Sequence, residues 1–160
     1  MKFLNLGEAG FAALGLTPLV PLRNVHMLMA KPGLKVVADR YQPTLILVRG
    51  LQGSGKSTLA TQLTTIGYRH FEADMFYEDK GFDPRLLKEA HTWCLHLTQR
   101  TLFFGQLAVV CNTFSTVVEL KPYLKLSDST MIIETCGAWQ SVHGISTAKK
   151  AHTANKWEVL

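Results

Sequence analysis

The sequence is poor in the features that would assign it to a disulfide-rich, membrane or disordered class. Its three cysteines, Cys94, Cys111 and Cys136, are far apart, odd in number and without CxxC spacing, which excludes a disulfide framework and a cysteine metal site. No apolar run approaches the roughly 20 residues that span a bilayer. Charged residues make up 18% without forming a block, and Glu8 interrupts the apolar start of the chain. We therefore expect a soluble, cytoplasmic protein with no membrane contact.

The length and composition of the chain are those of one globular domain. The chain has 160 residues, of which 47% are hydrophobic, enough for a single sizeable core but not for two. The net charge is +5 and the sequence pI is about 9.2, which favours polyanionic partners such as nucleotides or nucleic acid. Because the lysines and arginines are scattered, an ordinary basic surface fits these totals equally well. No particular protein partner is indicated.

The hydrophobic pattern divides the chain near residue 43. Residues 1–43 are broken up by glycine and proline and form a poorly patterned extension, with one short strand expected at 34–37. From Thr44 onward, buried-strand runs alternate with helical stripes, which predicts a three-layer α/β/α domain over 44–160 with a mainly parallel sheet. The expected strands are 44–48, 68–72, 107–111 and 130–135, the expected helices are 56–65, 84–104 and 117–126, and 73–82 is expected to be a loop.

A glycine-rich loop follows the first of these strands and fits the pattern GxxxxGK[ST] without a mismatch. Glycines let successive backbone N–H groups point at phosphates, and the following helix adds its positive N-terminal end. Lys56 supplies a charge for the β- and γ-phosphates, and Ser57 supplies a hydroxyl ligand for Mg²⁺. The sequence therefore predicts a P-loop NTPase-like site for ATP and Mg²⁺, built from Gly50, Gln52, Gly53, Ser54, Gly55, Lys56, Ser57 and Thr58.

The second expected strand ends beside a carboxylate, Asp74. In a parallel sheet this position lies at the edge where an acceptor would face the γ-phosphate, so Asp74 is our candidate general base. An aspartate that caps the next turn is the alternative interpretation. Glu72, Glu78 and Asp79 are weaker candidates for the base, and we interpret them as solvated loop charges.

The third expected strand ends at Cys111, where many P-loop proteins place a metal-holding aspartate. Cys111 is interpreted as a small core residue, so help for the metal must come from elsewhere. Asn112 and Thr113 follow it as candidate acceptor-side residues. Further on, 137–150 is a candidate lid that carries lysines, with an ordinary surface helix as the alternative. His143 in this segment is a further candidate acceptor-side residue.

With these residues in place, the chain resembles small P-loop phosphotransferases related to phage polynucleotide kinase, and a branch of short bacterial and phage proteins labelled AAA-family ATPases. The resemblance covers about residues 45–158. It implies that Asp74 is the acceptor-side aspartate and that Cys111-Asn112-Thr113 matches the Asp-Asn-Thr or Ser-Asn-Thr signature. The lid arginine of these kinases is not matched, because Gln140-Ser141 stands before Val142-His143-Gly144. The matching segments are 49–58, 72–76, 89–94, 109–114, 121–123 and the stretch from 143 to 158.

Three functions remain open on these grounds. The first is an ATP-dependent kinase that transfers the γ-phosphate to a hydroxyl, with the 5′ end of a nucleic acid as a candidate acceptor. The second is a nucleotide-binding or slowly ATP-hydrolysing module that acts through a partner, which the unmatched lid arginine and the missing carboxylate at position 111 favour. The third is a toxin-like kinase of a small sugar nucleotide. The choice between ATP and GTP is also open, because no adenine-recognising motif is legible.

Overall fold

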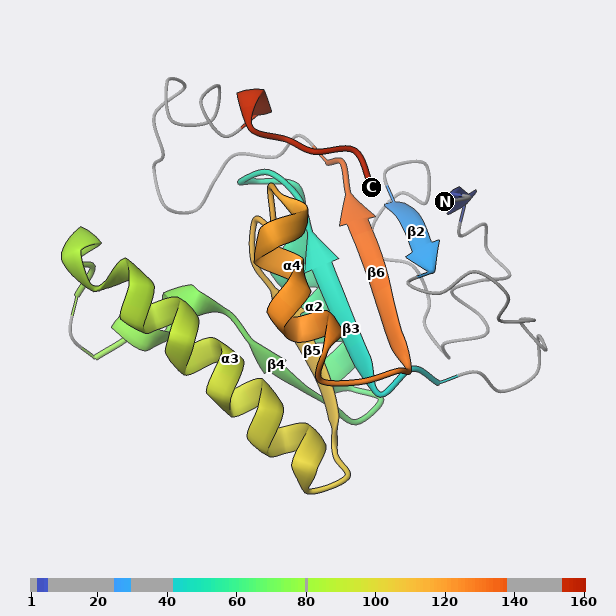
Figure 1. Ribbon diagram of the computed structural model, residues 1–160, viewed down its shortest axis with the longest axis horizontal. Helices are drawn as coiled ribbons and strands as arrows, with labels where there is room; N and C mark the ends of the chain where they lie inside the picture. The colour runs from blue at the N-terminus through green and yellow to red at the C-terminus, as the bar shows by residue number, and fades with distance from the viewer. Residues whose placement is uncertain (1–2, 6–24, 30–41, 80, 138–153) are drawn as a thin grey trace.

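The computed structural model of the chain describes residues 3–5, 25–29, 42–79, 81–137 and 154–160. Figure 1 shows how its elements are arranged. In chain order they are β1 (Phe3–Asn5), β2 (Val25–Met29), β3 (Leu45–Arg49), α2 (Lys56–Thr64), β4 (Tyr68–Phe71), the 3₁₀ helices η2 (Ala73–Tyr77) and η3 (Pro84–Leu86), α3 (Leu87–Phe103), β5 (Leu107–Cys111), α4 (Val117–Leu124) and β6 (Thr130–Thr135).

The strands form one six-stranded sheet in the order β1-β2-β6-β3-β5-β4. The strands β6, β3, β5 and β4 are mutually parallel, whereas β2 and β1 are antiparallel additions beyond β6. In the centre, Leu47 of β3 pairs with Val110 of β5 on one side and with Ile132 of β6 on the other. The carboxyl ends of the four parallel strands therefore meet at one edge of the sheet, where ligand sites of such folds lie.

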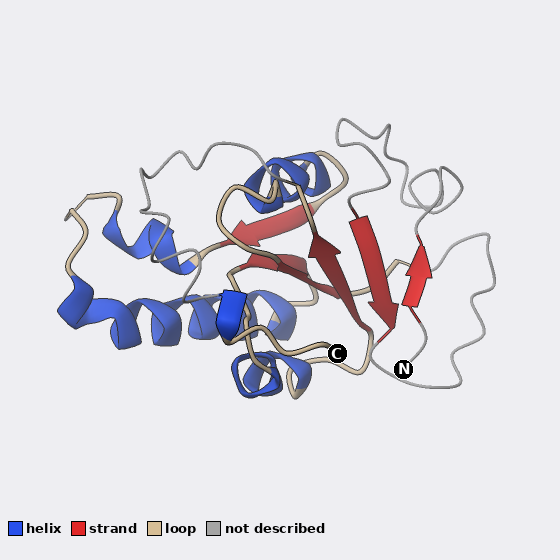
Figure 2. Cartoon of the chain, turned by 90° about the horizontal axis from the view of Figure 1, so that it is seen from above, coloured by secondary structure: helices blue, strands red, loops and turns tan. Residues whose placement is uncertain are grey.

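Helices cover both faces of this sheet (Figure 2). Side chains alternate between the faces along each strand, so that neighbouring residues of β3 enter different cores. Ile46 belongs to a cluster that contains Leu63 of α2, whereas Leu47 belongs to a second cluster with Cys94 of α3 and Leu120 of α4. The predicted three-layer α/β/α architecture with a mainly parallel sheet is thereby confirmed.

Most of the predicted elements from residue 44 onward agree with the structure. The strands at 107–111 and 130–135 have the predicted bounds, and β3 and α2 each differ from prediction by one residue. Asp83 caps as expected, because its carboxylate accepts a hydrogen bond from the backbone N–H of Arg85 at 2.9 Å. The first turn after it is 3₁₀ rather than α, and α4 ends two residues earlier than expected with Pro122 inside it.

The prediction of a plain loop at 73–82 was wrong for its first half, since 73–77 form η2. The backbone N–H of Ala73 donates to the side-chain oxygen of Asn112 at 3.0 Å, which ties the start of η2 to the end of β5. Tyr77 is buried in a small cluster with Ala73 and Ala90, and Phe76 packs against that cluster. These aromatic anchors order the segment and fix the direction in which it leaves the sheet.

Two strands come from the segment for which the sequence predicted little. The register of β2 runs from Val25 opposite Thr135 to Met29 opposite Met131, and β1 pairs with the outer side of β2. Part of residues 1–43 therefore extends the sheet beyond β6. The expected strand at 34–37 and the candidate lid from 138 to 150, including His143, lie outside the described residues. Among the residues that are described, no helix is long and apolar enough to cross a bilayer.

Candidate phosphate-binding site

The glycine-rich loop connects the carboxyl end of β3 to the first residue of α2. Gly53 and Gly55 have φ angles of 78° and 94°, in the left-handed region that glycine adopts without a steric cost. Gly55 directly precedes α2, and Lys56 is the first helical residue. The loop therefore turns sharply enough to direct its backbone into the start of the helix, as the motif predicted.

The loop is fixed to both neighbouring strands. The N–H of Gly50 donates to the carbonyl oxygen of Thr113, which follows β5, at 3.3 Å. The hydroxyls of Ser54 and Thr135, at the end of β6, are 2.7 Å apart and buried. The hydroxyl of Thr135 also donates to the carbonyl oxygen of Arg49 at 3.2 Å. These contacts hold the loop over the carboxyl edge of the sheet before any ligand is bound.

Gly50 is required here for space. A Cβ at this position would overlap the hydroxyl oxygens of Ser54 and Thr135 and would lie 2.7 Å from the carbonyl oxygen of Thr135. The carbonyl belongs to the backbone of β6 and has little freedom to move. Only a residue without a side chain therefore allows this approach of the loop to β6.

Gly50→Ala is therefore expected to destabilise the fold by about 1–3 kcal/mol, the usual cost of overpacking, and to weaken ATP binding because the loop must shift. Denaturant unfolding and calorimetric ATP titration measure the two effects. Gly105→Ala is the matched control, because its φ of 71° imposes a backbone cost of about 1–2 kcal/mol while its Cβ meets open space. Equal ATP affinity in the two variants would contradict the role of Gly50.

The amino end of α2 has the properties of an anion site. The helix has no side-chain cap and no acidic residue in its first turn, so the N–H groups of that turn and the positive helix end are uncompensated. The Nζ of Lys56 donates to the loop carbonyl of Leu51 at 3.0 Å, which keeps the ammonium group at the loop. The Oε1 of Gln52 is buried without a hydrogen-bond partner among the described residues. These groups fit the phosphates of a nucleotide.

Lys56 is held in a partly desolvated environment. Burial lowers the pKa of its ammonium group from the ordinary value, and Cys111, Glu72 and Asp74 offset part of that effect. A partly buried cation without a close anionic partner is costly in the free protein. A bound polyphosphate would supply the missing negative charge.

Two acidic residues, Glu72 and Asp74, follow β4 in different surroundings. Asp74 lies in the first turn of η2 with its side chain exposed, and its charge acts on Lys56. The interpretation of Glu72 as a solvated loop charge was wrong. Its side chain is only 16% exposed, and its Oε1 lies 2.8 Å from the Nε2 of His70. Glu72 faces the phosphate loop because it continues the side of β4 on which His70 lies.

Glu72 is poised as an anion. Burial raises the pKa of its carboxyl group, but hydrogen bonds from His70 and Ser57 and the charges of His70 and Lys56 outweigh this effect and lower the pKa below its ordinary value. Glu78 and Asp79, by contrast, are exposed as predicted. One of the three acidic residues interpreted as solvent-facing therefore belongs to the site.

The candidate acceptor-side residues after β5 are engaged with the backbone. Asn112 is buried, with its oxygen bonded to Ala73 and its nitrogen donating to the Sγ of Cys94 at 3.7 Å. Thr113 is half-buried and contributes its carbonyl to Gly50. The next residue, Phe114, has a φ of 46°, which is uncommon for a residue with a side chain. This turn positions the loop and η2 relative to each other.

A buried arginine lies directly before the loop. The side chain of Arg49 is 0% exposed, and its guanidinium carbon lies 4.0 Å from the centre of the Trp157 ring. Its Nη2 donates to the carbonyl oxygen of Glu158 at 2.8 Å, and its Nε lies 3.6 Å from the carboxylate of Glu134. Burial lowers the pKa of Arg49, and Glu134 is the first of the acidic neighbours that counteract it. These contacts attach residues 157–158 to the base of the phosphate loop.

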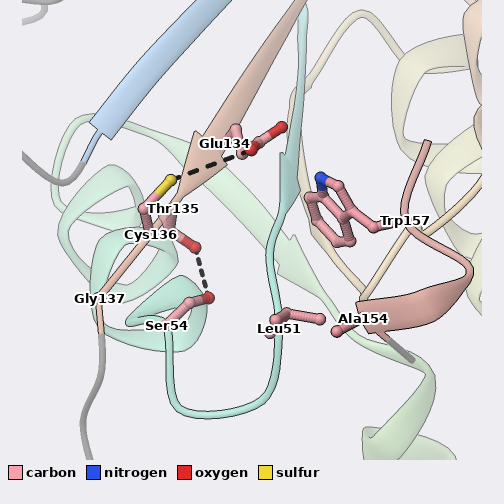
Figure 3. A pocket seen from close by; sticks show the side chains of 8 residues that line it. All are labelled: Leu51, Ser54, Glu134, Thr135, Cys136, Gly137, Ala154 and Trp157. Carbon is pink, nitrogen blue, oxygen red and sulfur yellow. Dashed lines mark hydrogen bonds between the residues drawn. The ribbon is translucent and has the colours of Figure 1, made fainter. Parts of the chain in front are cut away.

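A cavity of about 340 Å³ lies beside the loop on this side (Figure 3). One wall is the loop itself, another is the end of β6, and the third is the segment that carries Trp157. Its lining residues are Leu51, Ser54, Glu134, Thr135, Cys136, Gly137, Ala154 and Trp157.

Sequence reasoning missed two features of this site. The first, Glu72, was detectable from its spacing, because His70 and Glu72 are two residues apart at the end of a strand and so share one side of it. The second, the contact of Arg49 with Trp157 and Glu158, had no local signal, because these residues are more than a hundred positions apart.

The fold and the loop together define a phosphate-loop α/β domain. No protein-family profile matches the chain, and the AAA-family designation has no sequence-family support. Among solved structures, it is similar to a chain of the Pnkp1/Rnl/Hen1 complex, with a TM-score of 0.47 and 16% identity over 71% of this chain and 39% of that one. It is also similar to a gluconokinase from Sinorhizobium meliloti 1021, with a TM-score of 0.42 and 20% identity over 57% of this chain and 56% of that one. The chain spans less than two thirds of either neighbour.

Proposed function

We propose that this chain is an ATP-dependent phosphotransferase that moves the γ-phosphate to a hydroxyl acceptor, with the 5′-hydroxyl of a nucleic acid as the acceptor class. One observation carries the proposal. A complete phosphate loop, with the Nζ of Lys56 held at the carbonyl oxygen of Leu51, ends β3 at the same edge of the sheet where Asp74 follows β4, exposed in the first turn of η2. A carboxylate at this edge is the group that an acceptor hydroxyl requires as a general base.

The residues divide the work by position. The loop glycines and the first turn of α2 bind the phosphates, and Lys56 neutralises charge on the β- and γ-phosphates. When bound, Mg²⁺ spreads the charge of these phosphates, and Ser57 is its hydroxyl ligand on this chain. Asp74 accepts the proton of the acceptor hydroxyl as that oxygen forms its bond to the γ-phosphorus. The bond from this phosphorus to the bridging oxygen breaks, and ADP leaves with the electron pair.

A second function is favoured by the end of β5. No carboxylate stands there, Cys111 is buried, and the side chain of Asn112 is already bonded to Ala73 and Cys94. A module that binds ATP, or hydrolyses it slowly, and acts through a protein partner would tolerate this arrangement. The two functions predict different products from the same ATP.

The deciding experiment incubates the protein with ATP labelled at the γ-phosphate, Mg²⁺ and an oligonucleotide with a 5′-hydroxyl. The same oligonucleotide with a 5′-phosphate is the matched control, and free phosphate is counted alongside. The proposed kinase labels only the 5′-hydroxyl oligonucleotide, and Lys56→Met labels neither.

Other outcomes point elsewhere. Free phosphate without labelled oligonucleotide supports the hydrolysing module. Tight ATP binding with no product supports a module that needs its partner. Label that appears on sugar nucleotides but not on the oligonucleotide supports a small-molecule kinase and contradicts the nucleic-acid acceptor.

A further inference from the structure

The end of β5 offers no charged oxygen to a divalent cation. Cys111 is its last residue, is 1% exposed, and donates through its Sγ to the carbonyl oxygen of Lys56 at 3.6 Å. A thiol is a soft ligand that suits zinc or copper rather than Mg²⁺. The following Asn112 uses both ends of its side-chain amide within the protein. A hard cation at the phosphate loop therefore needs an oxygen ligand from another strand.

The neighbouring strand supplies one. β4 is parallel to β5, with Phe71 opposite Val110, so that Glu72 emerges next to Cys111 at the same edge. Ligand atoms of His70, Glu72 and Cys111 lie within 4.8 Å of one another. Of these three, the carboxylate of Glu72 is the hard oxygen ligand that Mg²⁺ prefers.

Glu72 also contacts the residue on which the metal depends. The hydroxyl of Ser57, in the phosphate motif, and the ammonium group of Lys56 both lower the pKa of its carboxyl group, which places that group near the start of α2. His70 holds the carboxylate from the other side, with 2.8 Å between Nε2 and Oε1. An exposed ion pair of this kind would be free to rotate, but these side chains are only 14% and 16% exposed. The carboxylate is thus fixed beside Ser57 before a ligand arrives.

We propose that Glu72 is the carboxylate that positions the Mg²⁺ accompanying the nucleotide at Ser57, and that His70 holds Glu72 in place for this task. Glu72, which follows β4, then provides the metal-positioning carboxylate that the end of β5 lacks. Mg²⁺ keeps several waters and binds proteins through one or two carboxylates together with phosphates, so contact through a metal-bound water satisfies the proposal as well as direct contact. The inference rests on the proposed function only in requiring that the chain bind a nucleotide.

The test measures metal binding directly. Mn²⁺ binding to the protein with a non-hydrolysable ATP analogue is followed by electron paramagnetic resonance, for the wild type and for Glu72→Gln. Carboxylates and partners that orient metal ligands are worth about 10- to 100-fold in metal affinity, and we expect a loss in that range. Affinity for the analogue in EDTA should stay within about twofold of wild type, because Glu72 does not contact the phosphates in this scheme.

Two further variants sharpen the result. Glu78→Gln, which changes an exposed carboxylate six residues away, should bind Mn²⁺ like the wild type. His70→Gln should show a smaller loss than Glu72→Gln, because it loosens the carboxylate without removing it. Thermal melting of all three variants checks that the fold is retained.

The outcomes separate this inference from the proposed function. Unchanged Mn²⁺ affinity in Glu72→Gln overturns the inference, and so does a loss of phosphate transfer at unchanged metal affinity, which would place Glu72 at the acceptor. If Glu72→Gln loses Mn²⁺ affinity as expected but the wild type transfers no phosphate, the inference is supported and the proposed kinase function is contradicted. A wild-type protein that binds the analogue neither with Mn²⁺ nor in EDTA overturns both.

Discussion

Lys56→Met is expected to reduce ATP affinity by about 10- to 150-fold, because hydrogen bonds to a charged group are worth about 1.5–3 kcal/mol. Phosphate transfer should fall by a further factor of about 10²–10³, since charge that develops on the phosphates in the transition state loses its stabilising cation. Methionine keeps most of the apolar stem of the lysine and removes only the charge. Calorimetric titration with ATP and the labelled-phosphate assay measure the two losses.

Stability distinguishes this loss from misfolding. Burial lowers the pKa of Lys56 in the folded state, so the unfolded chain binds more protons between the folded and the unfolded pKa, and stability rises with pH across that window. Below both pKa values the buried charge is a cost to the fold. Lys56→Met should therefore melt at or above the wild-type temperature without ligand, and the same ATP concentration should raise the melting temperature of the wild type more than that of the variant.

Lys121→Met changes an exposed lysine in α4 and is the control. It should leave ATP affinity within about twofold of wild type. Equal affinities in Lys56→Met and Lys121→Met would show that the phosphates bind elsewhere on the chain.

Asp74→Asn is expected to lower phosphate transfer by about 10²- to 10⁴-fold, the usual contribution of a general base. Asparagine has nearly the same shape but does not accept the proton of the acceptor hydroxyl. ATP affinity should change by less than about twofold, because Asp74 lies in η2 and not in the phosphate loop. Single-turnover transfer measured beside ATP titration separates the two quantities.

Asp79→Asn provides the comparison, since Asp79 is exposed just beyond the 3₁₀ helix that carries Asp74. Transfer at the wild-type rate in Asp74→Asn would mean that Asp74 only caps the turn. A loss of ATP affinity in Asp74→Asn would instead assign it to the nucleotide side of the site.

The features that the sequence predicted correctly are those coded by neighbouring residues. The strand before the loop is a continuous apolar run because it is buried on both faces, and all five residues of β3 are buried. The glycines of the loop and the lysine that opens α2 follow this strand directly. The position of the motif in the sequence therefore predicted its place at the carboxyl edge of the sheet. The same local logic located β5 and β6.

Most of the features that were missed depend on contacts between segments that are distant in the sequence. β1 and β2 have no distinctive period of their own; β2 is a strand because β6 offers it an edge, and β1 because β2 offers it one. η2 is ordered by Tyr77 against Ala90 and by Asn112 against Ala73. Glu72 is drawn from solvent by His70 and Ser57. The partners of β2 and η2 lie on other elements of the fold, whereas His70, a partner of Glu72, lies two residues before it.

The attachment of residues 157–158 to Arg49 has a consequence for the order in which the protein assembles. The hydrogen bond from Arg49 to Glu158 joins positions 109 residues apart. Glu158 also donates its N–H to the carbonyl of Ser115 at 2.8 Å and accepts from the N–H of Val117 at 2.6 Å, at the start of α4. During synthesis, β3 and its loop therefore emerge long before the groups that allow the guanidinium to be buried. Until then Arg49 stays hydrated, and we expect the carboxyl end of β3 to be among the last parts of the core to close.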